Sequence, residues 1–228
     1  MPDTIIVAID GPAGAGKSTV ARTLAKKLGF LHIDTGAMYR CVTLAALRLG
    51  TNMEDEKALE ALARDMIIEL KPADPENLVF LAGENVTKAI RDPKVSMGTK
   101  AIADAPGVRK ILVARQQKMG REDSTSYGGA VLEGRDIGTD VFPDAKYKFF
   151  LDASPDVRAK RRLGDLLRAG KSATYRQVLA DVMKRDANDM SRSVGALRKT
   201  KDSIVMDHSH LSVEQSAEEL FRYIRSNP

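Results

Sequence analysis

Residues 11–18 read Gly11-Pro12-Ala13-Gly14-Ala15-Gly16-Lys17-Ser18 and match the pattern G-x-x-x-x-G-K-[S/T] at every fixed position. The stretch follows an apolar run, residues 5–9, that predicts a buried strand. Glycines let successive backbone N–H groups converge on a phosphate, and a helix that opens at Lys17 adds the positive end of its dipole. The sequence therefore predicts a phosphate-binding loop between a strand and a helix.

The side chains of this loop indicate its chemistry. We expect Lys17 to reach the β and γ phosphates, Ser18 to place its hydroxyl on Mg²⁺, and Thr19 to reach an α-phosphate oxygen. A dinucleotide-binding G-x-G-x-x-G motif is excluded, because Thr19 stands where its third glycine would be. The loop alone leaves open which group accepts the phosphate.

The composition is that of a globular protein with a single domain, residues 1–228. Of the 228 residues, 43% are hydrophobic and 29% are charged, which suffices for one substantial core. The start, Met1-Pro2-Asp3, has no basic region, and the first apolar run is too short to span a bilayer. We therefore expect neither secretion nor membrane insertion, and a cytoplasmic location.

The single cysteine and the three histidines are not expected to carry chemistry. Cys41 lies in a helical pattern and is predicted to be a small packing residue rather than a nucleophile. His32, His208 and His210 lack the spacing of metal ligands, and residues 208–210 are predicted to form a polar loop.

The net charge of +5, from 36 basic and 31 acidic residues, raises the question of a nucleic-acid partner. The basic residues gather at 158–162 and at Arg185, Arg192 and Arg198, where a nucleotide-handling enzyme needs arginine. No nucleic-acid motif accompanies them, and 5% aromatic residues supply few stacking platforms. We expect no nucleic-acid partner.

Short apolar runs alternate with helical patterns, which is typical of a parallel sheet covered by helices. Besides residues 5–9, the predicted strands are 31–34, 130–132, 146–151 and 203–206. Helices are predicted over 17–28 and 37–49, each followed by a glycine. The last helix begins with a capping box at Ser212 and is expected to bury Val213, Ala217, Leu220 and Ile224.

Two segments interrupt the alternation. Residues 66–86 contain brief strand-like pieces and predict a small antiparallel insert, which is either a substrate-closing flap or a surface decoration. Residues 154–192 predict two charged helices, the first capped at Ser154 and the second at Thr174. With a phosphate loop in the same chain, we interpret this pair as a hinged lid.

Arginines follow two of the predicted strands. Arg40 lies in Asp34-Thr35-Gly36-Ala37-Met38-Tyr39-Arg40, and Arg135 in Glu133-Gly134-Arg135-Asp136. The carboxyl ends of strands in a doubly wound sheet form the binding crevice, so both segments are expected to face the phosphate loop. Arginines from several segments are what phosphoryl transfer requires.

These motifs, together with Phe142-Pro143-Asp144-Ala145 and Arg185-Asp186-Ala187-Asn188-Asp189-Met190-Ser191-Arg192, closely resemble the bacterial cytidylate kinase family. The resemblance runs from about Ile5 to the final helix. It implies a P-loop nucleoside monophosphate kinase with a five-stranded parallel core and an arginine-bearing lid at 154–192. It also implies a nucleoside-monophosphate-binding insert at 60–98, and a monomer.

The resemblance implies a role for each motif residue. Donor ATP lies on residues 11–19, with Mg²⁺ on Ser18. Arg40 and Arg135 hold the acceptor phosphate, which Arg192 also faces. Asp136 and Arg109 read the cytosine edge, and Asp189 and Arg185 hold the ribose hydroxyls. Arg158 and Arg162 close over the transferring group, and Thr35 and Lys100 complete the substrate-binding set. The catalytic set is then Lys17, Arg135, Arg158, Arg162 and Arg192.

Lys100 departs from the family, in which a serine at the aligned position helps to hold the cytosine amino group. A lysine ammonium has only donors and cannot accept that bond. Either Thr99 replaces the serine, or Asp136 carries the amino contact while Lys100 pairs with a carboxylate or phosphate. We favour Asp136. Asp10 and Glu133 are expected either in the outer shell of the site and the metal's water shell or in capping and turn roles.

The function expected from the resemblance is transfer of the γ-phosphate of ATP to CMP and dCMP. Within the same architecture, UMP or AMP is the alternative acceptor. A GTP-binding switch would need the guanine-reading motif N-K-x-D. It is excluded, because the chain has no Asn-Lys dipeptide. A nucleic-acid-binding ATPase is disfavoured by the scattered basic residues.

Overall fold

The structure is a computed structural model that describes residues 4–74, 76–168 and 170–228. The expectation drawn from Met1-Pro2-Asp3 lies outside the described residues. The central sheet of the protein has five strands in the spatial order β2-β6-β1-β7-β8, and every pairing is parallel. The strands are β1 (Ile5–Asp10), β2 (Leu31–Asp34), β6 (Gly129–Gly134), β7 (Tyr147–Asp152) and β8 (Ile204–Asp207). The predicted parallel sheet is confirmed.

Both faces of this sheet are buried, as parallel strands require. On β1, Val7 and Ile9 pack toward α1 (Lys17–Leu28) and α8 (Val213–Ser226). Ile6 and Ala8 point to the opposite face, where Phe142 and partly buried residues of α5 (Pro106–Lys118) cover them. The near-continuous apolar runs of the sequence follow from this two-sided burial.

The helix α2 (Thr35–Leu49) begins two residues earlier than the periodicity predicted. The carboxylate of Asp34, the last residue of β2, accepts a hydrogen bond from the Ala37 backbone at 2.9 Å and so caps the helix directly at the strand end. This short connection places Arg40 one turn into the helix, close to the edge of the sheet.

The insert between α2 and β6 forms a small three-stranded antiparallel sheet, as predicted. Its elements are α3 (Glu56–Asp65), β3 (Ile68–Lys71), β4 (Leu78–Leu81), β5 (Glu84–Asn85), a 3-10 turn (Ala89–Arg91) and α4 (Pro93–Asp104). They pack around α2 and form a core separate from the two faces of the main sheet.

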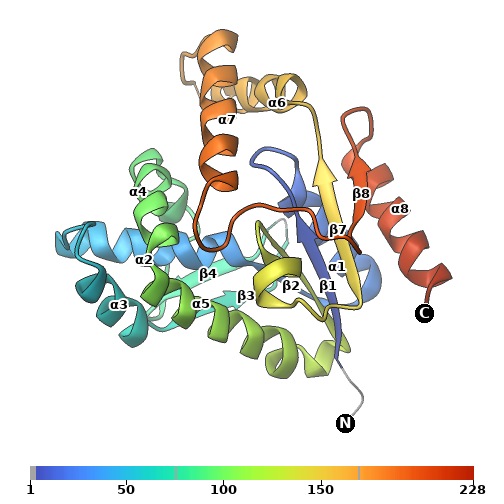
Figure 1. Ribbon diagram of the computed structural model, residues 1–228, viewed down its shortest axis with the longest axis horizontal. Helices are drawn as coiled ribbons and strands as arrows, with labels where there is room; N and C mark the ends of the chain where they lie inside the picture. Colours follow the sequence, from blue (N-terminus) through green and yellow to red (C-terminus); the bar gives the residue numbers. More distant parts are fainter. Residues whose placement is uncertain (1–3, 75, 169) are drawn as a thin grey trace.

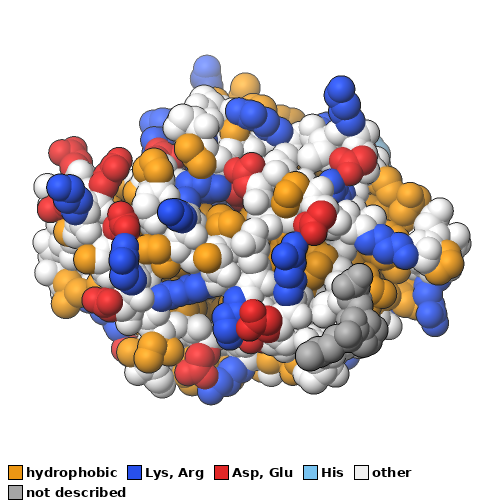
Figure 2. Space-filling view, turned by 60° about the horizontal axis from the view of Figure 1, so that its bottom comes forward, with side chains coloured by type: hydrophobic (Ala, Val, Ile, Leu, Met, Phe, Trp, Pro, Cys, Tyr) orange, Lys and Arg blue, Asp and Glu red, His pale blue; other side chains and the backbone are white. Residues whose placement is uncertain are grey.

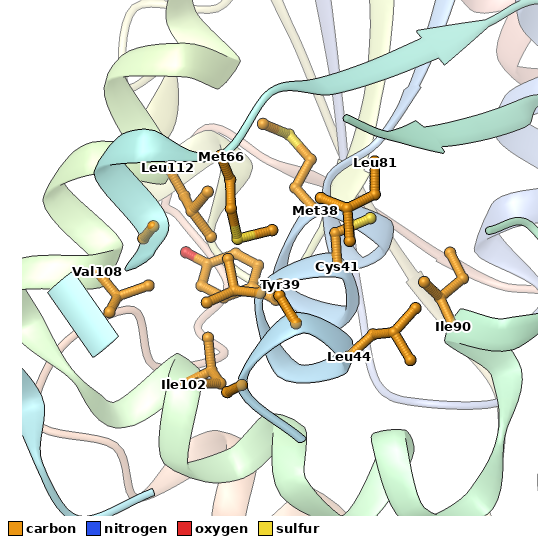
Figure 3. Packing of buried hydrophobic residues seen from close by; sticks show 14 of the residues in the cluster. Met38, Tyr39, Cys41, Leu44, Met66, Leu81, Ile90, Ile102, Val108 and Leu112 are labelled. Carbon is orange, nitrogen blue, oxygen red and sulfur yellow. The ribbon is translucent and has the colours of Figure 1, made fainter. Parts of the chain in front are cut away.

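Figure 3 shows that core from close by. Side chains from α2, among them Met38, Cys41 and Leu44, meet Leu112 of α5 and Ile102 of α4. Cys41 is fully buried, and this burial raises the pKa of its thiol to about 12, which agrees with the predicted packing role. Tyr39 packs in the same cluster, although its hydroxyl takes part in the site described below.

Helices α6 (Pro155–Arg168) and α7 (Tyr175–Met190) lie side by side beyond the carboxyl end of β7 (Figure 1). The predicted caps are present: Ser154 accepts from the Val157 backbone at 3.3 Å, and Thr174 forms a capping box with Gln177. A small apolar cluster joins the pair: Ala159, Val178 and Val182 are buried, and partly buried side chains such as Leu163 and Leu179 pack against them. The chain then returns to β8 through an extended segment.

The surface mixes charges of both signs. On the face drawn in Figure 2, Lys and Arg side chains are interspersed with Asp and Glu. Among the residues that the structure describes, none of the helices is both long and apolar enough to cross a membrane.

Candidate active site

A cleft of about 830 Å³ opens at the carboxyl edge of the main sheet. Segments that follow β1, β2, β6 and β8 line it on the sheet side, and α4, α6 and α7 supply further walls. The predicted site residues that line it are Ala13, Gly14, Gly16, Lys17, Ser18, Thr19, Thr35, Arg40, Arg109, Arg135, Asp136, Arg185, Asp189 and Arg192. The fold thus gathers segments from Ala13 to Val213, nearly the whole chain, around one space.

The phosphate loop joins β1 to α1 at one end of this cleft. Gly11 has a φ of 151°, and a Cβ atom there would lie 2.0 Å from the carbonyl oxygen of Leu151, so only glycine fits. Within the described residues, no side chain caps the start of α1 at Gly16. The positive end of the helix and its first backbone N–H groups are therefore available to an anion.

Lys17 lies buried at the base of the loop and donates to the Pro12 carbonyl oxygen at 2.8 Å. Burial and the nearby Arg135 guanidinium lower the pKa of Lys17 to about 7. The negative charge of a bound phosphate would raise the pKa of Lys17 and so favour its protonated form.

On the next segment, Asp34 orients Arg40. The Arg40 guanidinium donates to Asp34 at 2.9 Å, and the same carboxylate caps α2. The Thr35 hydroxyl donates to the Glu133 carbonyl oxygen at 2.7 Å and ties the start of α2 to the end of β6. Arg40 is therefore presented to the cleft from a fixed base.

Arg109 and Asp136 form a buried ion pair deep in the cleft, with side chains 5% and 9% exposed. Arg109 also donates to the Tyr39 hydroxyl at 3.3 Å. Burial raises the pKa of Asp136, and the Arg109 guanidinium opposes that rise. Asp10 fixes the loop that carries Asp136, because its carboxylate accepts from the backbone of Ile137 and Gly138 at 2.8 Å each.

Asp189, near the end of α7, joins two arginines. Its oxygens lie 2.8 Å from Arg135 Nε and 2.7 Å from Arg192 Nη2. Opposite charges beside it outweigh burial and lower the pKa of Asp189. Arg185 lines the cleft one helical turn earlier. Four predicted site residues thus lie together: Arg135, directly after β6, and Arg185, Asp189 and Arg192, in or directly after α7.

Glu133 and Ser18 meet near the phosphate loop. Glu133 is buried, and burial together with the Asp34 charge raises its pKa. Its Oε1 atom has no hydrogen-bond partner among the described residues. A hydroxyl beside a buried carboxylate oxygen suits a hydrated Mg²⁺, which favours oxygen ligands and keeps several waters.

Of the predicted residues, Gly11, Pro12 and Ala15 belong to the phosphate loop but do not line the cleft. Three further predicted residues do not line it either. Lys100 is exposed and pairs with Asp104 at 2.5 Å, whereas Thr99 lines the cleft. The pairing of Lys100 with a carboxylate agrees with the alternative that we favoured, but its place in the substrate-binding set does not agree with the structure. Adjacent residues of a helix lie on different faces. Because Thr99 of α4 faces the cleft, its neighbour Lys100 faces solvent.

Arg158 is the second. Its guanidinium is 3% exposed and pairs with Asp186 through both Nη atoms, at 3.0 and 2.5 Å. It also donates to the carbonyl oxygens of Ala153 and Ala13. A guanidinium this deeply buried has to be fully paired, so Arg158 braces α6 against α7 and the phosphate loop and does not project into the cleft. Arg162, the third, is exposed on α6.

The structure also adds residues that the sequence patterns missed. From α6, Arg161 and Arg168 line the cleft, and Arg91 does so from the insert. His208 lines it too: residues 208–210 lie in a loop between β8 and α8, as predicted, but His208 is only 2% exposed there. Its position directly after β8, at the carboxyl edge of the sheet, was the signal available in the sequence.

A phosphate loop that faces a row of arginines across one cleft defines a P-loop kinase. The family model for cytidylate kinase matches residues 7–226. The chain is 48% identical over 210 residues to the cytidylate kinase of Pelotomaculum thermopropionicum, covering 92% of this chain and 91% of the relative. The chain belongs to the cytidylate kinase family.

Two further cytidylate kinases are similar over nearly their whole length. The cytidylate kinase of Syntrophotalea carbinolica is 44% identical over 220 residues, which cover 96% of this chain and 92% of the relative. That of Pasteurella multocida is 41% identical over 227 residues, with 100% and 98% covered. Among solved structures, an uncharacterized protein from Eubacterium ventriosum shares the fold at a TM-score of 0.52 and 15% identity, covering 98% of this chain and 99% of that one.

Proposed function

We propose that this enzyme transfers the γ-phosphate of ATP to CMP and to dCMP, and releases CDP or dCDP together with ADP. The observation that supports this most strongly is the shared cleft. It has a phosphate loop at one end and the buried Arg109–Asp136 pair at the other, in a chain of the cytidylate kinase family. One nucleotide then lies on each side of the row of arginines.

The donor lies on residues 11–19. Backbone N–H groups of the loop and the Lys17 ammonium bind the β and γ phosphates. Ser18 is the residue that would hold Mg²⁺, with Glu133 bonding to its waters. When bound, this ion neutralises charge that develops on the transferring group.

The acceptor phosphate lies between Arg40 and Arg135, which approach from the ends of β2 and β6. Arg192 completes this cationic wall, and Asp189 with Arg185 holds the ribose. Planar guanidinium groups suit bidentate contacts with phosphate oxygens, and they neutralise charge without a covalent intermediate.

Asp136 distinguishes cytosine from uracil. Cytosine offers an amino donor where uracil has a carbonyl acceptor. A carboxylate therefore accepts a hydrogen bond from the cytosine amino group and repels the uracil carbonyl oxygen. Burial raises the pKa of Asp136, and the paired Arg109 guanidinium opposes this and favours the charged carboxylate. The same reasoning disfavours UMP as the acceptor.

Residues 154–192 act as a lid, and residues 60–98 contain the insert that closes on the monophosphate. Closure excludes water from the phosphates and brings Arg162 toward them, next to Arg161 and Arg168. In this proposal the enzyme acts as a monomer in the cytoplasm, without a nucleic-acid partner.

A coupled assay of ADP release tests the proposal, with CMP, dCMP, UMP, AMP and GMP offered in parallel. We expect kcat/KM to be highest for CMP and dCMP. A rate that does not depend on the acceptor would contradict the proposal and would indicate simple ATP hydrolysis.

A further inference from the structure

Arg192 is held from two walls of the cleft. Its Nη2 atom lies 2.7 Å from Asp189 on its own segment, and its Nε atom lies 3.3 Å from Oδ1 of Asp104. Asp104 is the last residue of α4 and belongs to the insert, whereas Arg192 follows α7. The contact between Asp104 and Arg192 therefore joins the insert to the end of the helix pair.

The local structure of α4 does not explain an aspartate at this position. A carboxylate in the last residue of a helix faces the negative end of the helix dipole. Its neighbour Lys100 lies four residues earlier, which is the less favourable order for such a pair. The contact with Arg192 gives Asp104 a partner outside its own helix.

Ion pairs connect basic and acidic side chains in alternation from Lys100 to Arg135. Lys100 binds Oδ2 of Asp104 at 2.5 Å, and Oδ1 faces Arg192. Asp189 then links Arg192 to Arg135 at the end of β6. Asp104 itself does not line the cleft, although its neighbour Ala103 and Thr99 do.

The result is a restrained guanidinium. Nη2 of Arg192 donates a hydrogen bond to Asp189, whereas the buried Nε faces Asp104 at ion-pair distance without forming a hydrogen bond. In the part of the chain that the structure describes, Nη1 has no hydrogen bond either, so it is the atom available to a ligand. Arg192 lines the same cleft as Tyr39 and Asp136, and its charge acts to lower the pKa of both groups, although burial raises each of them.

We propose that Asp104 is a positioning residue for the acceptor nucleotide, which orients Arg192 across the cleft while Lys100 balances its remaining charge. The inference rests on the proposed function, since it takes the ligand of Arg192 to be CMP. Loss of the Asp104 carboxylate should free the Arg192 side chain, and the acceptor would then have to order it on binding.

The test compares Asp104→Asn with Asp104→Glu and with the control Glu60→Gln. Glu60 forms an exposed pair with Arg64 at the same i,i+4 spacing, at 2.6 Å, on α3 of the same insert. We expect Asp104→Asn to raise the KM for CMP about three- to fivefold, the size of one partly exposed ion pair, and to change the KM for ATP and kcat by less than about twofold. Asp104→Glu should recover most of the loss, and Glu60→Gln should match the wild type.

A second comparison shows whether Asp104 acts through Arg192. In an Arg192→Met background, Asp104→Asn should have almost no further effect on the KM for CMP. Additive effects, an equal rise in the KM for ATP, or an unchanged KM for CMP in Asp104→Asn would overturn the inference. If the wild-type protein shows no CMP-dependent ADP release, the proposed function itself fails, which is a separate result.

Discussion

At the scale of single residues, the cleft is built from ionised side chains that hold one another. Arg109 with Asp136, and Arg135 and Arg192 with Asp189, form ion pairs at its wall. Each pair fixes a guanidinium or a carboxylate before any nucleotide arrives. Such preorganisation reduces the cost of ordering side chains when the substrate binds.

The cytosine preference should depend on Asp136. The variant Asp136→Asn keeps the shape of the side chain but adds an amide donor, which can face the uracil carbonyl. We expect the ratio of kcat/KM for CMP over UMP to fall about 5- to 160-fold, which corresponds to the roughly 1–3 kcal/mol that one base-reading contact contributes. Steady-state kinetics with both acceptors measures this ratio.

Thr99→Ala is the matched control, because Thr99 lines the same cleft. It should change the ratio little. If the ratio collapses in the Thr99 variant and survives in the Asp136 variant, the assignment of base recognition to Asp136 is wrong.

Asp10 should make the stability of the fold depend on pH. Burial raises its pKa from 3.8 to about 7, so the folded chain holds a proton that the unfolded chain releases between these values. The free energy of unfolding should therefore fall as the pH rises from about 4 to about 7, with a contribution of up to about 1.4 kcal/mol per pH unit from this group.

Urea denaturation at several pH values measures this slope. In Asp10→Asn the slope over that range should become shallower, since the amide does not titrate. An identical slope in the variant and the wild type would show that Asp10 does not titrate there.

At the scale of elements, the helix pair α6 and α7 is joined by a small apolar cluster and by the buried Arg158–Asp186 pair. Arg158→Met removes one partner and leaves a buried carboxylate. We expect the free energy of unfolding to fall by about 3–5 kcal/mol. Chemical denaturation monitored by circular dichroism measures the loss.

The double variant Arg158→Met with Asp186→Leu removes both charges and should recover much of that stability. If the single variant were as stable as the wild type while kcat fell sharply, Arg158 would have the catalytic role that the family resemblance predicted. The brace seen here would then be a secondary feature.

Elements and their order were predictable from the sequence because their determinants are local. The apolar runs, the glycines after α1 and α2, and the capping residues Thr174 and Ser212 depend on neighbours a few residues away. The start of α2 was misplaced because Asp34 serves both as the end of a strand and as a cap, which periodicity does not reveal.

Side-chain direction was less predictable. The family resemblance implied that Arg158 faces phosphates, but the direction of its side chain depends on Asp186, 28 residues later. Lys100 and Thr99 could not be separated until the rotation of α4 was known. His208 was misjudged because its burial depends on the phosphate loop and α8, which are distant in sequence.

At the scale of the whole molecule, one sheet edge collects every part of the site. The five strands end at the same edge, the insert covers one side of the cleft, and α6 with α7 covers another (Figure 1). In the function that we propose, the donor and the acceptor approach this edge from different sides, and motion of the two covers would control the entry of water.

Lys17 links this architecture to the chemistry. Lys17→Met replaces a buried ammonium by an apolar side chain of similar length, so the fold should persist. Transfer should slow by at least about a thousandfold, because the cation that stabilises the migrating charge is lost. ADP release and circular dichroism on the same sample measure both effects, and near-normal turnover would contradict the role given to the phosphate loop.

The most direct test of the account follows the phosphoryl group itself. The protein is incubated with Mg²⁺, CMP and ATP labelled in the γ-phosphate, and the nucleotides are separated by chromatography. The account predicts that the label leaves ATP and is found in CDP, one equivalent for each ADP formed. Label that is released as inorganic phosphate, with no labelled CDP, would contradict it.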